Sequence, residues 1–257
     1  MKICSLIPLT LIFVAFTGAV ANAEDLFLAD GSAFPGQLWL SEGGTAERSL
    51  VQRAARPDPA FPNAVTKLAQ TAVGSDGKIY YASGLDGCVM HLLDGRNEIM
   101  SFEFPGQIRD LATTGEEHTV YFSVVATPQD GAPVAAGKIY RRDLWDGRPS
   151  EVATVEPYSI AGDWWGTFTI KNGVVYIVTW GDRSRIYRLT SRGEELVFES
   201  RARIEGLTSG AGDDFFFVTG DRNVYRTADF VTVETVLRTD RVLTDVALQS
   251  SADAPRP

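Results

Sequence analysis

The sequence predicts an all-β protein assembled from repeated four-stranded sheets. Short runs of β-branched, aromatic and aliphatic residues alternate with turns rich in glycine and aspartate, most clearly in residues 74–99. Units of this kind recur at intervals typical of radially repeated sheets. No long stretch keeps the 3.6-residue apolar period of a helix. Together these observations predict a β-propeller, a ring of sheets called blades, and the units described below indicate five of them.

The first 23 residues are expected to be a signal peptide and not part of the fold. Lys2 supplies a positive start, residues 7–16 form an apolar core, and residues 21–23 (Ala-Asn-Ala) fit the small-x-small cleavage rule. We therefore expect cleavage before Glu24 and export to the periplasm or the cell exterior. An uncleaved anchor is the alternative, although the apolar run is short for a bilayer span. No later stretch is apolar enough for stable membrane insertion.

Composition limits the partners that this chain could bind. The formal net charge of −9 argues against nucleic acid and anionic lipid. After cleavage only Cys88 remains, so no disulfide framework is expected, and its apolar strand favours a buried small hydrophobe over a reactive thiol. We expect a monomer with one propeller domain at residues 24–249 and a disordered tail at 250–257.

Five segments open successive units, and in each an apolar residue follows the third residue. They are residues 65–69, 108–112, 165–169, 204–208 and 243–247. Their spacings of 43, 57, 39 and 39 residues fall near the period of propeller blades. The second strands are expected at 78–82, 119–125, 174–179 and 214–219, the third at 88–93, 138–141, 185–188 and 223–226, and the fourth at 99–104, 151–155, 195–199 and 233–238.

One blade is expected to be shared by the two ends of the chain. The final strand, 243–249, has no partners after it, whereas the strands at 25–29, 36–40 and 48–52 have no opening strand before them. Joined, these four strands complete a blade. Four internal blades and this composite blade give five, and the closure removes an exposed sheet edge that would favour aggregation.

Two motifs resemble those of a known group of propellers. Residues 77–87 (Gly-x-Ile-Tyr-Tyr-x-x-Gly-x-Asp-Gly) and 137–141 (Gly-Lys-Ile-Tyr-Arg) are similar to blades of YWTD-type and gluconolactonase-like six-bladed propellers. The full Tyr-Trp-Thr-Asp tetrad of those blades is absent, and five units are found in place of six. The resemblance spans nearly all of the mature chain and implies the propeller fold, but it carries over no function.

Loop lengths differ between the two faces of the predicted ring. Blade-to-blade loops and loops between second and third strands share one face, here named the loop face, and the remaining connections share the turn face. The three enlarged connections, 53–64, 126–137 and 156–166, all belong to the loop face. Because functional loops tend to be the long ones on a rigid scaffold, we expect the binding site there. Neutral variation of surface loops is the alternative.

Aromatic residues dominate the chemistry offered by the loop face. Asp163, Trp164 and Trp165 end one enlarged loop, and Trp180 ends a second strand near the same face. Indoles beside a carboxylate suit stacking on a sugar, a peptide aromatic ring or a cationic head group. These residues predict a ligand-binding site for a protein, peptide or glycan. Packing between blades is the alternative for the indoles.

The innermost strands are predicted to place five residues at equivalent positions around the central channel. They are Lys67, Asp110, Thr167, Gly206 and Asp245. Lys67 and the neighbouring Arg109 are further candidate ligand-binding residues. The two carboxylates could perform acid–base chemistry or bind a cation such as Ca²⁺, and structural ion pairing across the channel is the alternative. Because Thr167 and Gly206 leave the ring incomplete as a cage, neither a metal nor a cofactor is predicted.

No catalytic motif stands out in the sequence. His91 and His118 are the two histidines, and neither is placed beside a plausible nucleophile. Metal-binding and nucleotide-binding motifs are likewise missing. The sequence therefore favours a binding module over an enzyme. Two alternatives stay open, namely a hydrolase or lactonase that uses Asp110 and Asp245 with a cation at the channel mouth, and a structural module of a cell-envelope assembly.

Overall fold

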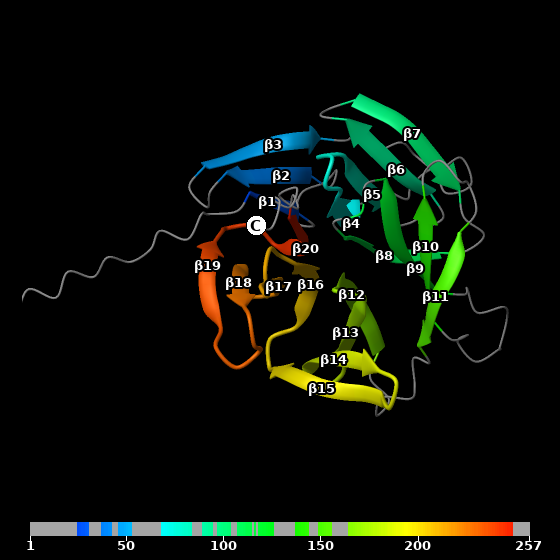
Figure 1. Ribbon diagram of the computed structural model, residues 1–257. Coiled ribbons are helices and arrows are strands. Elements are labelled where there is room, and N and C mark those ends of the chain that lie inside the picture. Colours follow the sequence, from blue (N-terminus) through cyan, green and yellow to red (C-terminus); the bar gives the residue numbers. More distant parts are fainter. Residues whose placement is uncertain are drawn as a thin grey trace, which may run out of the picture.

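Twenty strands form five antiparallel sheets in the computed structural model, which describes residues 25–30, 37–42, 46–52, 68–83, 89–94, 97–103, 107–114, 116, 118–125, 137–143, 149–155 and 164–248. The sheets stand around a common centre as the blades of a ring (Figure 1). Within the described ranges, no helix is long and apolar enough to span a membrane. The predicted all-β, five-bladed propeller is confirmed.

Each blade consists of four strands in order from the centre of the ring to its rim. Blade 1 contains β20 (Leu243–Leu248), β1 (Leu26–Asp30), β2 (Gln37–Glu42) and β3 (Ala46–Gln52). Blade 2 contains β4 (Leu68–Val73), β5 (Ile79–Ser83), β6 (Val89–Asp94) and β7 (Asn97–Glu103). Blade 3 contains β8 (Gln107–Thr113), β9 (Thr119–Val125), β10 (Gly137–Asp143) and β11 (Ser150–Val155). Blade 4 contains β12 (Trp164–Lys171), β13 (Val174–Trp180), β14 (Ser184–Thr190) and β15 (Gly193–Ser200). Blade 5 contains β16 (Ile204–Ser209), β17 (Phe215–Thr219), β18 (Asn223–Thr227) and β19 (Glu234–Arg238).

The two ends of the chain meet in blade 1. Strand β20 pairs with β1 in antiparallel register, with Leu26 opposite Leu248 and Leu28 opposite Val246. In Figure 1 the red final strand lies beside the blue first strands. This pairing confirms the predicted closure, and it covers the inner edge of β1 that would otherwise be exposed.

Apolar side chains between neighbouring blades form the core. Phe27 of blade 1 and Val73 and Tyr81 of blade 2 belong to one such cluster, and each is at most 5% exposed. All five residues of β17 are buried, whereas the outer strand β15 is mostly exposed. Burial that falls from the centre outwards is expected for a ring of packed sheets, because each inner strand is covered by blades on both sides. The result is a rigid scaffold for the loops.

A bulge interrupts each innermost strand where it pairs with the second strand of its blade. The extra residues are Ala69 in β4, Arg109 in β8, Gly166 or Thr167 in β12, Glu205 in β16 and Thr244 in β20. Bulges re-aim the side chains beside them. The five residues at the matching position after each bulge are Gln70, Asp110, Thr167, Gly206 and Asp245.

This register corrects the predicted alignment of the first unit. Gln70, and not Lys67, is the residue of β4 that matches Asp110 and Asp245. The sequence pattern aligned the apolar pair Leu68-Ala69, but in the structure Thr71-Ala72 occupies the equivalent place. Lys67 itself lies outside the described residues.

Candidate functional site

Asp245 connects two blades through backbone hydrogen bonds. Its side chain is buried, and Oδ2 accepts the N–H of Thr71 at 2.7 Å. Oδ1 accepts the N–H of Val246, the next residue of the same strand, at 2.8 Å. Because Thr71 lies in β4 and Asp245 in β20, this carboxylate joins the innermost strands of blades 1 and 2.

Asp110 makes the corresponding connection between blades 3 and 4. Its Oδ2 atom accepts the N–H of Phe168 at 2.7 Å and the hydroxyl hydrogen of Thr167. Thr71 and Phe168 hold matching positions one residue beyond the bulge site of their strands, so the two carboxylates form the same kind of bond. Among the described residues, no group of three His, Cys, Asp or Glu side chains is placed to hold a metal ion.

Burial changes the acidity of both carboxyls. Removal from water raises the pKa of Asp110 to about 7, although hydrogen bonds from Thr167, Phe168 and Leu111 act in the opposite direction. Burial also raises the pKa of Asp245 well above its usual value, and the nearby charge of Asp110 adds to this effect. The pair at the centre of the ring therefore holds a proton more readily than surface carboxyls do.

Gly206 allows close approach of two innermost strands. A Cβ atom at this position would lie 2.6 Å from the Cα of Asp245, closer than such atoms approach in folded proteins. Because Gly206 has no side chain that could accept the N–H of Val246, this N–H donates to Oδ1 of Asp245 in its own strand. Asp110, Thr167, Gly206 and Asp245 thus serve the contact between blades in different ways.

Trp180 is the predicted site residue whose surroundings are best defined. Its Nε1–H donates to the carbonyl oxygen of Ile204 at 2.6 Å, which attaches the end of β13 to the start of β16. Gly166 makes room for the indole, since a Cβ there would lie 2.6 Å from Nε1. The guanidinium of Arg203 lies over the ring, 3.8 Å from its centroid, and Nε of Arg203 is 3.1 Å from Oε1 of Glu205.

The same arrangement recurs at the entry to blade 1. The guanidinium of Arg241 lies 3.4 Å from the ring centroid of Trp39, and its Nη1 atom is 3.5 Å from Oδ2 of Asp30. Trp39 packs against the core cluster of blades 1 and 5, so it contributes to the contact between these blades. Both arginines lie in blade-to-blade loops, so both belong to the loop face.

Backbone hydrogen bonds link three neighbouring connections of the loop face. The N–H of Gly220 donates to the carbonyl of Arg203 at 3.0 Å, and the N–H of Thr239 donates to the carbonyl of Arg222 at 3.2 Å. The connections after β15, β17 and β19 therefore form one continuous border over blades 4, 5 and 1. We name its four arginines, which are Arg201, Arg203, Arg222 and Arg241, the arginine rim.

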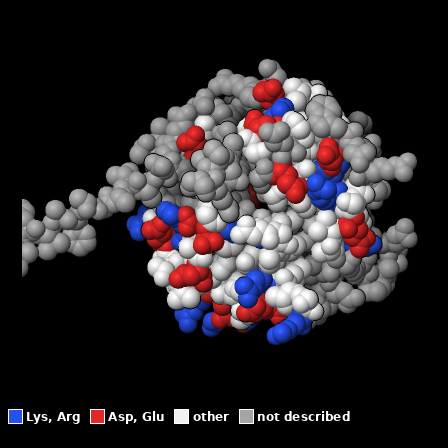
Figure 2. All heavy atoms as spheres, in the orientation of Figure 1, with Lys and Arg blue, Asp and Glu red and all other residues white. Residues whose placement is uncertain are grey.

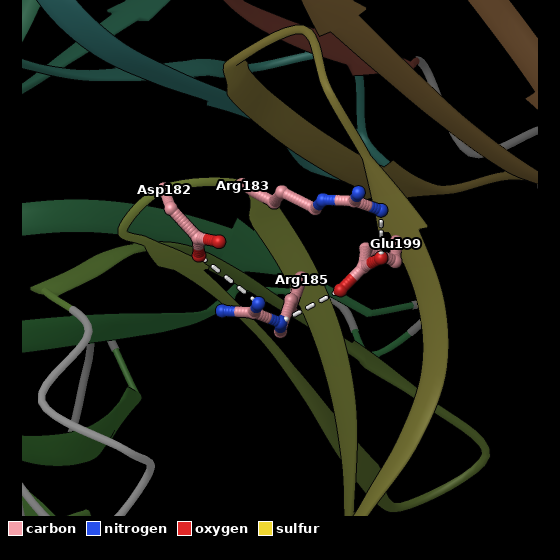
Figure 3. A network of polar contacts seen from close by, with 4 residues as sticks. All are labelled: Asp182, Arg183, Arg185 and Glu199. Atoms are coloured by element: carbon pink, nitrogen blue, oxygen red, sulfur yellow. Dashed lines mark hydrogen bonds and ion pairs between the residues drawn. The ribbon is translucent and has the colours of Figure 1, made fainter.

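A polar network extends the loop face over the outer part of blade 4 (Figure 3). Glu199 on β15 accepts hydrogen bonds from Arg183 and, at 2.9 Å, from Nε of Arg185. Asp182 accepts a further bond from Nη2 of Arg185 at 3.0 Å. These contacts join the β13–β14 loop to the outermost strand, so the loop is held in one arrangement.

The remaining predicted site residues are only partly placed. Asp163 lies outside the described residues. Trp164 and Trp165 begin β12, where their backbones pair with Trp180 and Thr179, and Arg109 occupies the bulge of β8. Trp164 therefore stands directly across from Trp180 in the sheet.

Sequence reasoning missed Arg203 and Arg241. Each precedes an innermost strand by one or two residues, and this recurrence before 204–208 and 243–247 was the available signal. The two histidines serve other contacts. His91 stacks on Tyr81 with ring centroids 4.8 Å apart, and Nδ1 of His118 lies 3.3 Å from Oδ2 of Asp76 on the turn face.

Comparisons with known proteins return a fold likeness alone. No protein-family model and no curated protein matches the sequence. Among solved structures, the chain is similar to the β-propeller domain of Cps50 (Swd1) from Myceliophteria thermophila, with 13% identity and a TM-score of 0.42. The alignment covers 81% of this chain and 66% of that one. The assignment of the fold here rests on the strand pairing described above.

Proposed function

We propose that this protein is an exported binding module that holds a protein, peptide or glycan partner on its loop face. The observation that supports this function most directly is the stack of Arg203 on Trp180. An exposed guanidinium is held there between an indole and a carboxylate, and it is ready to meet a partner.

The contribution of the stack to the stability of the fold is too small to explain why Arg203 is held between Trp180 and Glu205. The side chain of Arg203 is 56% exposed, and exposed ion pairs contribute only about 0–1 kcal/mol. A pre-oriented side chain, in contrast, loses little conformational entropy when a partner binds. Trp180 is itself fixed by its hydrogen bond to Ile204, so the platform is rigid before binding.

The two buried aspartates support binding over hydrolysis. Asp110 and Asp245 direct their oxygens to backbone N–H groups of neighbouring blades, and each is only 2% exposed. A hydrolytic carboxyl has to reach its substrate directly or through one water molecule. We therefore assign these residues to the connection between blades.

Site-specific photo-crosslinking in the exporting cell tests this proposal. A photoreactive amino acid would replace Arg222 on the loop face or, as the matched control, Arg192 at the exposed β14–β15 turn of the turn face. We expect a discrete crosslinked partner from position 222 and none from position 192. Crosslinks from position 192 alone, or from neither position, would overturn the proposal.

A further inference from the structure

We infer that the arginine rim recognises carboxylate side chains of an acidic polypeptide segment. The inference rests on the proposed function and names the chemistry of its partner. Four arginines on three linked connections supply the binding groups, so the relevant feature is one surface and not a set of unrelated residues.

Some guanidinium groups of the arginine rim are exposed and can donate hydrogen bonds to a partner. Arg201 and Arg222 are exposed, and the side chain of neither forms a hydrogen bond or an ion pair with the described residues. Arg203 uses Nε for Glu205, which leaves its two Nη groups. Arg241 is more deeply set, at 26% exposure, and contributes chiefly by its position over Trp39.

The carboxylates of the same border are largely engaged within the protein. Asp221 accepts the hydroxyl hydrogens of Thr219 and Tyr225 and the N–H of Asn223. Burial raises the pKa of Asp221, but these hydrogen bonds outweigh it and hold the pKa below its usual value, so the group stays ionised. Glu205 is paired with Arg203. The exposed arginine side chains of the rim can therefore donate hydrogen bonds to a partner, whereas the carboxylates of Asp221 and Glu205 are already engaged within the protein.

Carboxylates fit this surface better than a phosphate backbone does. A guanidinium presents parallel N–H donors that match the two oxygens of a carboxylate. Asp221 and Asp240 stand between the arginines along the chain, so the positive charges are separated and do not form a continuous basic track for a phosphate backbone. Among the described residues on the face shown in Figure 2, small groups of both signs are mixed. Such spacing suits separated Asp or Glu side chains on a peptide.

The test measures binding of a fluorescent synthetic peptide of alternating glutamate and glycine to the mature protein. The matched probe has glutamine in place of glutamate. We expect binding of the glutamate peptide alone, and about tenfold weaker affinity for the double variant Arg203→Gln with Arg222→Gln. Arg192→Gln on the turn face should bind as the wild type does. Melting temperatures of all variants show whether each is folded.

Arg203→Lys separates geometry from charge. Lysine keeps the positive charge but lacks the planar fork, so we expect affinity between those of the wild type and Arg203→Gln. Three results would overturn the inference. The two peptides could bind equally, or Arg192→Gln could weaken binding of the glutamate peptide as much as the double variant does. A single-stranded polynucleotide could also bind more tightly than the glutamate peptide. If position 222 crosslinks a cellular partner while the glutamate peptide fails to bind, the inference is wrong and the proposed function stands. If position 222 crosslinks nothing, the proposed function fails first.

Discussion

The Oδ2 atom of Asp245 accepts the backbone N–H of Thr71 at 2.7 Å, although the two residues lie 174 positions apart in the sequence. This bond joins the last strand of the ring to the first internal blade. It stands beside the β1–β20 pairing, so closure depends on a side chain as well as on a strand ladder. Four predictions follow from this arrangement and from the proposed export.

Asp245→Ala should strongly destabilise the domain. It leaves the buried N–H groups of Thr71 and Val246 without their acceptor, and each unpaired group costs about 1–3 kcal/mol. We expect the free energy of unfolding, measured by urea titration, to fall by about 2–6 kcal/mol. Thr244→Ala, which loses one part-buried hydroxyl bond to Ala29, is the control and should cost about 1 kcal/mol. Equal midpoints for the two variants would contradict the connecting role.

Gly206→Ala should be destabilising because β16 and β20 have no room for a methyl group at this point. The added carbon would lie 2.6 Å from the Cα of Asp245, and overpacking of this kind costs about 1–3 kcal/mol. Gly220→Ala is the matched control, since nothing lies within 4 Å of its Cβ position. Thermal unfolding of both variants checks the prediction, and a melting temperature unchanged in Gly206→Ala would show that the strands can separate freely.

Stability should fall as the pH rises through neutrality. The folded state holds protons on Asp110 and Asp245 more tightly than the unfolded chain, because burial raises both pKa values. Their contribution is full below the unfolded pKa of about 4 and is lost as the pH passes the folded pKa of Asp110, about 7. Melting temperatures measured from about pH 5.5 to 8.5 should therefore decline.

Asp110→Asn supplies the control for this pH dependence. The amide cannot titrate, so the slope of melting temperature against pH should become shallower. A slope as steep as that of the wild type would assign the effect to other groups.

The mature protein should begin at Glu24 if the N-terminal segment is a cleaved signal. Intact-mass measurement on protein recovered from the periplasm or medium checks this start. Ala23→Arg, which breaks the small-residue rule, should leave the precursor uncut. Recovery of a membrane-bound chain that retains Met1 would favour the anchor alternative instead.

Repeat spacing predicted most of the architecture from sequence. The strand at Thr119–Val125 was predicted with the observed bounds, and the composite blade was predicted from strands left over at both ends. These features depend on local composition and on strand count, which a sequence displays directly. The blade order therefore needed no knowledge of contacts between blades.

Register and stacking contacts could not be predicted in the same way. Residues 68–69 (Leu-Ala) match the apolar pattern of the other units better than residues 71–72 (Thr-Ala), and only the pairing with β5 shows that residues 71–72 follow the bulge position. The contact of Arg203 with the Trp180 ring could not be predicted for a different reason. Arg203 reaches that ring after two further strands of blade 4, so the contact exists only once the blade has folded.

The pairing of Leu26 with Leu248 fixes where both ends of the folded domain emerge. Strand β20 starts from a connection on the loop face and finishes on the turn face, and β1 begins beside that finish. A purification tag, a fused neighbour or a solid support attached at either end would thus sit behind the ring. The arginine rim would then lie on the opposite face of the ring from such an attachment.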